Sequence, residues 1–311
     1  MSLNADQIKE VKNQGFLINR GTELFSGRII TGNGVLTAAE LKTACEAAEK
    51  YGNGNLTFTT RQTIELPGIP YEKIPEFKQF VIERGLSVGG TGRRVRPIVS
   101  CKGTTCIYGL HDTQEMAAEI HERFFKGYED ILFPHKIKIS VGGCPNNCVK
   151  PDINDIGIMG QKIPIVHAEI CKVCKKCKVE AVCPMNAAVK SEVIEIDEEI
   201  CVKCGRCSDK CPFGAVTGGT TLYKIFIGGQ WGKHRYLGHE LSRLFERDEV
   251  MDIIESSMLF FKKEGRLGER FRQTIDRIGV DTVEKAIMSK ELLAQKEEIL
   301  KNEWDLATGK T

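Results

Sequence analysis

The chain has 311 residues, enough for about two domains with a sizeable core, and its 44 basic and 42 acidic side chains leave a formal charge of +2. That balance excludes a strong bulk preference for nucleic acid or a membrane surface, and no stretch stays apolar over the roughly 18 residues of a membrane span. The polar start, residues 1–6, lacks the regions of a signal peptide, so we expect a cytoplasmic protein, in which thirteen cysteines favour metal sites over disulfides.

The first 85 residues predict a small α+β layer. A short strand contains Arg28, and it is followed by a helix over 37–50, strands within 56–66 and a helix over 72–84. Alternation along a strand would place Thr59, Arg61 and Thr63 on one face. The helix over 37–50 has an apolar stripe that includes Cys45, and we expect this cysteine to be a buried structural thiol.

A glycine-rich basic segment follows that layer. It reads Gly89-Gly90-Thr91-Gly92-Arg93-Arg94-Val95-Arg96, and its spacing is not that of a dinucleotide-binding fingerprint. Such a segment can bind anions through backbone N–H groups and guanidinium groups. An arginine on an ordinary surface is the alternative at each position.

Four cysteines then form two short pairs. Cys101 and Cys106 have C-x4-C spacing, and Cys144 and Cys148 have C-x3-C spacing in a turn rich in Gly, Pro and Asn. Four thiolates from two such loops can hold a [4Fe–4S] cluster. Four buried free thiols, or one zinc ion, are the alternatives on spacing alone.

Between the two pairs, the sequence predicts a helix over 113–126, capped by Asp112, and a strand over 136–141. Side chains alternate along this strand, so Lys136, Lys138 and Ser140 share one face while residues 137, 139 and 141 face the core. A solvated face is the more common interpretation of that pattern. Because the strand runs directly into Cys144, we favour a functional role for the two lysines.

The most specific motif lies within residues 166–217. Each of two runs has three cysteines at x2 spacing and then a Cys-Pro, which is the ligand pattern of a bacterial ferredoxin with two [4Fe–4S] clusters. In such modules the last cysteine of each run ligates the other cluster, so two crossed sets are expected. The sets are Cys171, Cys174, Cys177 and Cys211, and Cys201, Cys204, Cys207 and Cys183. Zinc is the disfavoured alternative for repeated CxxC pairs.

The rest of the chain carries weaker signals. A strand over 222–227 is expected to resume the main domain, and Gly228-Gly229-Gln230-Trp231-Gly232 follows it. The tail from residue 240 has a charged, helical pattern, and we expect it to pack on the core or on a partner.

The paired cysteines, the segment Thr59-Thr60-Arg61-Gln62-Thr63 and the strand after Pro134 together closely resemble the signature of sirohaem-dependent sulfite and nitrite reductases. A ferredoxin module inserted into so short a chain most resembles the C subunit of anaerobic sulfite reductases. The resemblance implies a sirohaem and three [4Fe–4S] clusters, one coupled to the sirohaem through Cys148 and two in the module. Many family members have x5 spacing in the first pair, so the match of Cys101 is less specific than that of Cys106.

The resemblance also implies roles for the basic residues, because sirohaem is a polyanion and the substrate is an oxyanion. It implies that Arg28, Arg61, Lys136 and Lys138 bind the substrate, with the lysines as proton donors and the arginines as fixed charges. Arg93, Arg94 and Arg96 are then expected to bind sirohaem carboxylates.

A domain organisation follows from the same resemblance: an α+β, sulfite reductase-type half with an inserted 2[4Fe–4S] ferredoxin module. We expect a ferredoxin-like half-domain at 1–85, a sirohaem and [4Fe–4S] domain at 86–165 and 218–311, and the module at 166–217. Full-length reductases of this family contain two such halves, so a homodimer or hetero-oligomer is expected. No NAD or flavin motif is evident, so an electron-donor flavoprotein or ferredoxin subunit is expected as a partner.

The leading hypothesis is therefore sirohaem-dependent reduction of sulfite to sulfide, with electrons entering through the ferredoxin module. Reduction of nitrite to ammonia is a close alternative, because the same type of centre performs both reactions. A non-catalytic iron-sulfur electron-transfer protein is the alternative from a different class. It leaves the paired cysteines and the basic strands unexplained.

Overall fold

The computed structural model describes residues 3–301, and the chain divides into two compact units. The first unit comprises Met1–Ser100, Ala117–Ile139 and Glu255–Thr311, and the second comprises Cys101–Met116 and Ser140–Ile254. The predicted domain at 1–85 begins with two residues, 1–2, that lie outside the described residues. The predicted domain that ends at residue 311 likewise includes residues 302–311, which lie outside them.

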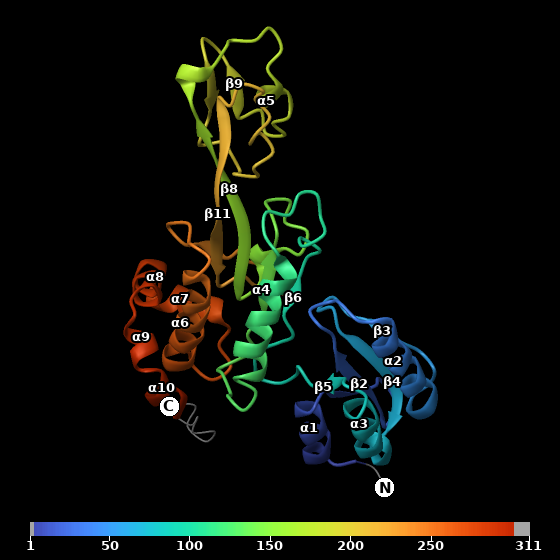
Figure 1. The fold of residues 1–311 in the computed structure, drawn as a ribbon. Coiled ribbons are helices and arrows are strands. Elements are labelled where there is room, and N and C mark those ends of the chain that lie inside the picture. Colours follow the sequence, from blue (N-terminus) through green and yellow to red (C-terminus); the bar gives the residue numbers. More distant parts are fainter. Residues whose placement is uncertain (1–2, 302–311) are drawn as a thin grey trace. The chain divides into compact units, whose positions relative to one another are not determined.

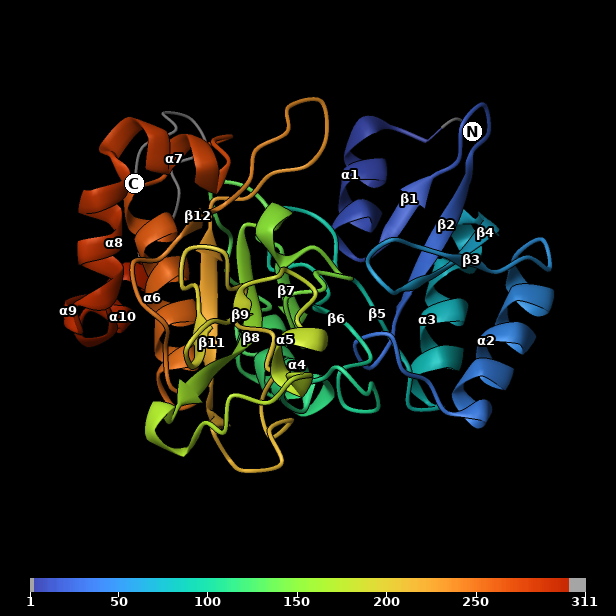
Figure 2. The same ribbon diagram turned by 90° about the horizontal axis from the view of Figure 1, so that it is seen from above.

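The first unit begins with an antiparallel sheet of order β1-β2-β4-β3, and a further strand, β5, pairs with β2 (Figure 1). Helices α2 and α3 lie side by side next to this sheet (Figure 2). The elements are α1 (Ala5–Asn13), β1 (Phe16–Ile18), β2 (Leu24–Ile30), α2 (Ala38–Tyr51), β3 (Thr57–Phe58), β4 (Ile64–Pro70), a 3-10 turn (Tyr71–Lys73), α3 (Ile74–Ile82) and β5 (Ser87–Val88).

The predicted helix over 37–50 is present as α2, and Thr37 forms a capping box with Glu40 at its start. Its buried face, however, comprises Ala44, Ala47, Ala48 and Tyr51. Cys45 is exposed, so the prediction of a buried structural thiol is wrong. The apolar stripe is centred on Ala44 and Ala48, and Tyr51 completes it one turn later, which leaves Cys45 beyond the edge of that face.

The predicted strand through residues 59–63 is wrong as well, because this stretch forms the turn between β3 and β4. Gln62 has a φ of 56°, which a continuing strand does not allow. The N–H of Thr59 donates to the carbonyl of Thr63 at 2.9 Å, and the two threonine hydroxyls lie 2.7 Å apart. Arg61 therefore projects from the tip of a hairpin and not from a strand face.

The first unit also includes most of the remaining helical residues. The predicted helix over 113–126 is α4 (Thr113–Ile120) followed by a π-helical turn (His121–Lys126), and Asp112 accepts the N–H of Glu115 as its cap. The tail forms α6 (Glu249–Glu264), α7 (Phe271–Ile278), α8 (Val280–Met288), α9 (Glu291–Ala294) and α10 (Lys296–Lys301).

The tail packs on the same unit through a buried carboxylate. Glu255, with a side chain only 9% exposed, accepts the hydroxyl of Tyr128 at 2.5 Å and pairs with Lys296 at 2.6 Å. Lys262, also buried, donates to the carbonyl of Leu132 at 3.0 Å. The contacts with Tyr128 and Leu132 join the tail to the segment 117–139, so the tail packs on the core, one of the two outcomes expected.

The second unit is built on a long antiparallel ribbon of β8 (Ile156–Val166) and β11 (Val216–Ile227), flanked by β7 (Ile139–Gly142) and β12 (His239–Glu240). The ribbon runs from the pair Ile156–Ile227 to the pair Val166–Val216. Residues 167–215 connect its two strands along the chain and lie at the end of the ribbon formed by Val166 and Val216 (Figure 1). They include a 3-10 turn (Ala168–Ile170), α5 (Lys178–Ala181) and the hairpin of β9 (Ala188–Lys190) and β10 (Ile194–Ile196).

Two short elements complete the structure: β6 (Val99–Ser100) and a 3-10 turn (Pro151–Ile153). Among the described residues, no helix combines the length and the apolar character needed to cross a membrane.

Candidate metal and anion sites

The structure brings the four paired cysteines together in the second unit; we call them the paired-cysteine site. Gly103 and Gly143 allow this approach, since a Cβ on Gly143 would lie 3.1 Å from the Cα of Gly103. The N–H of Gly143 donates to the sulfur of Cys101 at 3.2 Å. Burial raises the pKa of the Cys144 thiol, and the nearby Cys101, Cys148 and Cys106 raise it further. The raised pKa means that forming the thiolate is unfavourable, and a positively charged metal group would offset this.

Local turns present these thiols. Asn147 adopts a left-handed φ of 56° within the second pair, and its side chain donates to Asp152 at 2.9 Å. The hydroxyl of Ser140 donates to the carbonyl of Val149 at 3.2 Å, which ties β7 to the loop that carries Cys148. Cys148 is exposed at the end of this loop, where a cofactor could reach it.

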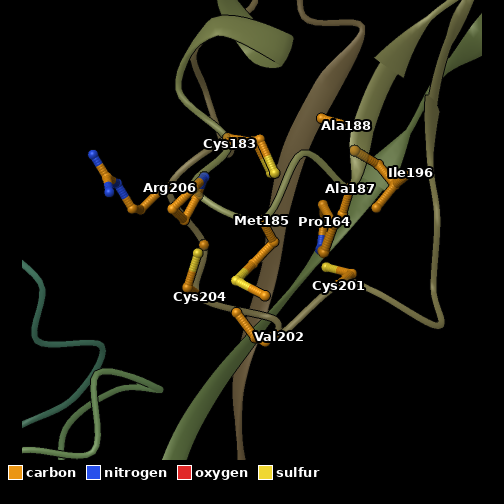
Figure 3. A pocket seen from close by; sticks show the side chains of 13 residues that line it. Pro164, Cys183, Met185, Ala187, Ala188, Ile196, Cys201, Val202, Cys204 and Arg206 are labelled. Carbon is orange, nitrogen blue, oxygen red and sulfur yellow. The ribbon is translucent and has the colours of Figure 1, made fainter.

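The eight module cysteines line two separate cavities. One cavity, the first module site, is lined by Cys171, Cys174, Cys177 and Cys211. The other, the second module site, is lined by Cys183, Cys201, Cys204 and Cys207. Figure 3 shows the sulfurs of Cys183, Cys201 and Cys204 turned toward this second cavity.

Packing within the module supports both sites. A small buried cluster of Val179, Ala188, Ile194, Ala215 and Val216 forms its core, and cysteines of both runs pack against it. Burial together with the neighbouring Cys201, Cys204 and Cys183 raises the pKa of Cys207 to about 11. Each set of four thiols thus lies around one cavity, which suits a cluster with sulfur ligands.

No three His, Cys, Asp or Glu side chains in the described part of the chain converge on a point in the way that a single metal ion requires. The donor chemistry of the three cysteine sites, four sulfurs each, fits iron-sulfur clusters.

A second group of predicted site residues gathers around the glycine-rich segment in the first unit. Arg28 and Arg96 both donate to the carbonyl of Gly90, at 2.9 Å and 2.7 Å. Gly90 has a φ of 68°, and a Cβ there would lie 2.6 Å from the ring of Pro97. Arg28 also makes two hydrogen bonds to Glu65, of 2.9 Å and 2.6 Å, so its charge is already balanced.

Arg61 lies against the segment that leads into β7; the predicted strand over 136–141 begins only at Ile139, so Lys136 and Lys138 precede it. Its guanidinium donates to the carbonyl of Ile139 at 3.1 Å and also to the carbonyl of Pro97. Lys136 and Lys138 are half-buried, whereas Ile137 and Ile139 are 1% and 0% exposed, which confirms the predicted core face. Ser140 is fully buried, so the lysine face does not continue past residue 138.

The positive charges around residue 135 make this region strongly electropositive. Burial, reinforced by the charges of Arg270, Lys136, Arg96 and Arg93, lowers the pKa of His135 to about 4. Buried guanidinium nitrogens of Arg93 (Nη1) and Arg94 (Nε) have no hydrogen-bond partner among the described residues. Orphaned buried donors in a positive environment fit an anionic group such as a carboxylate, so the chain's own residues fit a polyanionic cofactor.

The structure also singles out residues that the sequence analysis did not consider. Lys172, Lys176, Lys178 and Lys190 line the first module site. Arg206, between Cys204 and Cys207, places its guanidinium 5.5 Å from the ring centre of Tyr108. The lysines were visible in the sequence as a basic run among cysteines, whereas nothing in the sequence pointed to the Arg206–Tyr108 contact.

Two family descriptions match most of the chain. Residues 91–296 match the nitrite and sulphite reductase 4Fe-4S domain, and residues 18–83 match the nitrite/sulfite reductase ferredoxin-like half domain. The fold is similar to that of dissimilatory sulfite reductase I, with a TM-score of 0.68 and 23% identity over 86% of this chain and 69% of that one.

Two curated relatives are similar over much of the chain. The coenzyme F420-dependent sulfite reductase of Methanocaldococcus jannaschii is 31% identical over 77% of this chain and 38% of its own length. The C subunit of the anaerobic sulfite reductase of Salmonella typhimurium is 32% identical over 57% of this chain and 55% of its own length. The matched part thus spans less than two thirds of either relative.

Proposed function

Because the chain belongs to the nitrite and sulfite reductase family, we propose that it is a sirohaem-dependent reductase of sulfite to sulfide. The resemblance predicted from its cysteine and basic motifs is thereby confirmed at the level of the family. The observation that carries the proposal is the convergence of the four paired cysteines within the second unit. The electropositive group of arginines and lysines within the first unit supports it independently.

Twelve cysteines would hold the iron-sulfur clusters. Cys101, Cys106, Cys144 and Cys148 would hold one [4Fe–4S] cluster, and Cys148 would also couple this cluster to the sirohaem. The two module sites are assigned to two further clusters of an inserted ferredoxin module. The donor set of four sulfurs at each site and the exposure of Cys148 support this assignment.

When bound, the sirohaem and its coupled cluster supply an iron for the sulfur of the substrate and the electrons that the reduction consumes. Arg93, Arg94 and Arg96 would hold the carboxylates of the cofactor. The orphaned donors of Arg93 and Arg94 support this role, and Arg96 is fixed in position by the carbonyl of Gly90.

The remaining basic residues would act on the substrate anion. Two backbone carbonyls hold Arg61. Its charge is therefore already in position, and no free energy of reorganisation is needed when the reaction occurs. Lys136 and Lys138 can give up protons, which arginine does not do at ordinary pH, so they are proposed as the proton donors. The charge of Arg28 is already neutralised by Glu65.

The direct test is anaerobic turnover with reduced viologen as the electron source, comparing sulfite with nitrite as kcat/KM. A strong preference for sulfite, with sulfide as the product, would support the proposal. A preference for nitrite with ammonia as product would keep the site and change the substrate, which the family's name also allows. Absence of turnover with either, in protein that carries its clusters and sirohaem, would contradict an enzymatic role for the chain on its own.

A further inference from the structure

The two module sites differ sharply in the charge of their surroundings. Lysines 172, 176, 178 and 190 line the first site, and Lys175 is exposed in the same loop. None of the described residues that line it is acidic. The second site is lined mainly by apolar side chains, and Arg206 is the one charged residue among the described residues that line it.

The second site lies next to the paired cysteines. Arg206 projects away from the cavity in Figure 3, and its guanidinium lies 5.5 Å from the ring centre of Tyr108, two residues after Cys106. The hydroxyl of Thr221 on β11 donates to the carbonyl of Leu110 at 2.9 Å, so the ribbon also contacts this loop. Beside Thr221, the N–H of Lys162 donates to the carbonyl of Lys203, next to Cys204.

The first site lies farther along the ribbon. It is lined by Ala215, which precedes the terminal pair Val216–Val166. Pro164 of β8 lines the second site, and at about 3.3 Å per residue the two residues from Pro164 to Val166 place the terminal pair roughly 7 Å farther along the ribbon. The module therefore has an inner site beside the paired cysteines and an outer site.

The outer site has the surface of a docking patch. Phe213 lines it and is 49% exposed, and Val173, next to Lys172 in the sequence, is 47% exposed. An apolar centre with a charged rim is the usual anatomy of a transient protein interface. Acidic side chains also occur in the module: Glu169 and Glu180 flank the lysine loop, and residues 192–199 carry five more in a segment whose Ile194 also lines the first site.

We propose that Lys172, Lys175, Lys176 and Lys178 form the docking surface for a small acidic electron-carrier protein, which delivers electrons at the outer site. This inference rests on the proposed function and names its electron donor by chemical class. In each encounter the reduced carrier gives up one electron to the module and leaves in its oxidised form. Clustered lysines attract such a carrier from a distance and speed its association in a salt-dependent way.

Two single substitutions that change the net charge by the same amount distinguish binding at this surface from a general effect of protein charge. Lys176→Glu reverses a charge at the outer site, and Arg206→Glu makes the same reversal at the inner one. The probe is a purified acidic plant-type [2Fe–2S] ferredoxin, and its binding to the whole cluster-loaded chain is measured by titration calorimetry at low and high salt. Lys176→Gln, which removes the charge without reversing it, provides a milder version, and iron content checks that each variant is intact.

We expect Lys176→Glu to weaken binding of the ferredoxin about tenfold and to reduce the salt dependence of binding. Lys176→Gln should have the same effects to a smaller degree. Arg206→Glu should leave the affinity near that of the parent protein. Equal weakening by both reversals, or no binding of the ferredoxin by the parent protein at low salt, would overturn the proposal. The binding assay needs no turnover. A failure of sulfite reduction in the viologen assay would therefore leave this result intact, and failure here would leave the viologen result intact.

Discussion

At the scale of single residues, the chain divides its cations between two kinds of environment. Arg28, Arg61 and Arg96 are fixed by carbonyls or a carboxylate, whereas Arg93 and Arg94 keep buried donors without partners among the described residues. The first group sets the shape of the positive region. The second group supplies the hydrogen bonds that an anion can complete.

His135 reports on that positive region through its pKa. Its folded value of about 4 lies below the usual 6.5, so the folded state resists protonation. The stability that this provides is present above about pH 6.5 and is lost as the pH falls from there toward 4. We expect His135→Gln to flatten the pH dependence of the thermal midpoint in this window, whereas His234→Gln, at an exposed position, should leave it unchanged.

The same histidine offers a spectroscopic check on cofactor binding. Anionic carboxylates near Arg93 and Arg96 would offset their charge, so the pKa of His135 should rise when sirohaem is bound. An NMR titration of the ring in protein with and without sirohaem measures this. An unchanged pKa would argue that the cofactor carboxylates lie elsewhere.

Lys138 tests the proposed proton donors. Replacing it by Met removes an acid from the substrate region while keeping much of the volume, and general acids typically contribute at least about a hundredfold to a rate. We expect kcat to fall by about that factor while sirohaem content, read from the visible spectrum, stays near normal. Loss of sirohaem together with activity would instead indicate a role in cofactor binding.

Cys148→Ser tests the bridging role at the paired-cysteine site. The variant should lose the coupled cluster and turnover, because an alcohol is a poor ligand for iron compared with a thiolate. The module clusters should remain, since their cysteines line separate cavities. Turnover retained by this variant would rule out Cys148 as the bridge.

At the scale of elements, the helical tail contacts the segment 117–139 through Glu255. Burial alone would raise the pKa of this carboxylate, but hydrogen bonds from Lys296 and Tyr128 outweigh burial and hold it below its usual value. The pairing therefore stabilises the fold at pH values above the ordinary pKa of a glutamate. This stabilisation is lost as the pH falls through the lowered pKa of Glu255.

Removing that carboxylate should loosen the tail. Glu255→Ala leaves the buried hydroxyl of Tyr128 without an acceptor, and we expect a loss of about 2–3 kcal/mol in unfolding free energy. Tyr128→Phe removes the donor without burying an unpaired group and should cost only about 1 kcal/mol. Thermal midpoints of the two variants measure the difference. Equal midpoints would show that the network adds little to stability.

At the scale of the whole molecule, the three cysteine sites predict a definite iron content. Three four-iron clusters correspond to about twelve iron atoms per chain, with one more for a sirohaem. Iron and acid-labile sulfide analysis of anaerobically purified protein measures this. About four fewer iron atoms would mean that one of the three sites holds no cluster.

The assembly is a prediction at the same scale. The resemblance implies reductases with two halves, and this chain carries one set of paired cysteines, so a homodimer or hetero-oligomer is expected to complete the enzyme. Sedimentation of the active protein tests this expectation. A strictly monomeric species with full activity would contradict it.

The sequence alone determined the chemistry that depends on close spacing along the chain. Thiols at x2, x3 and x4 spacing identified three sulfur-rich sites, alternation identified the buried face of Ile137 and Ile139, and a short polar residue identified the cap at Asp112. The family followed from the same motifs. Such features are local, because the backbone of one turn or strand fixes which neighbouring side chains lie together.

The tertiary structure decided everything that depends on segments far apart in the sequence. A hairpin turn, and not a strand, carries Arg61 to the carbonyl of Ile139, and the packing of α2 turns Cys45 outward. Glu65 neutralises Arg28 from a neighbouring strand, and Arg206 meets Tyr108 across nearly a hundred residues of chain. Which residues come into contact depends on the burial of apolar faces and on the pairing between strands. Neither can be read from a short stretch of sequence.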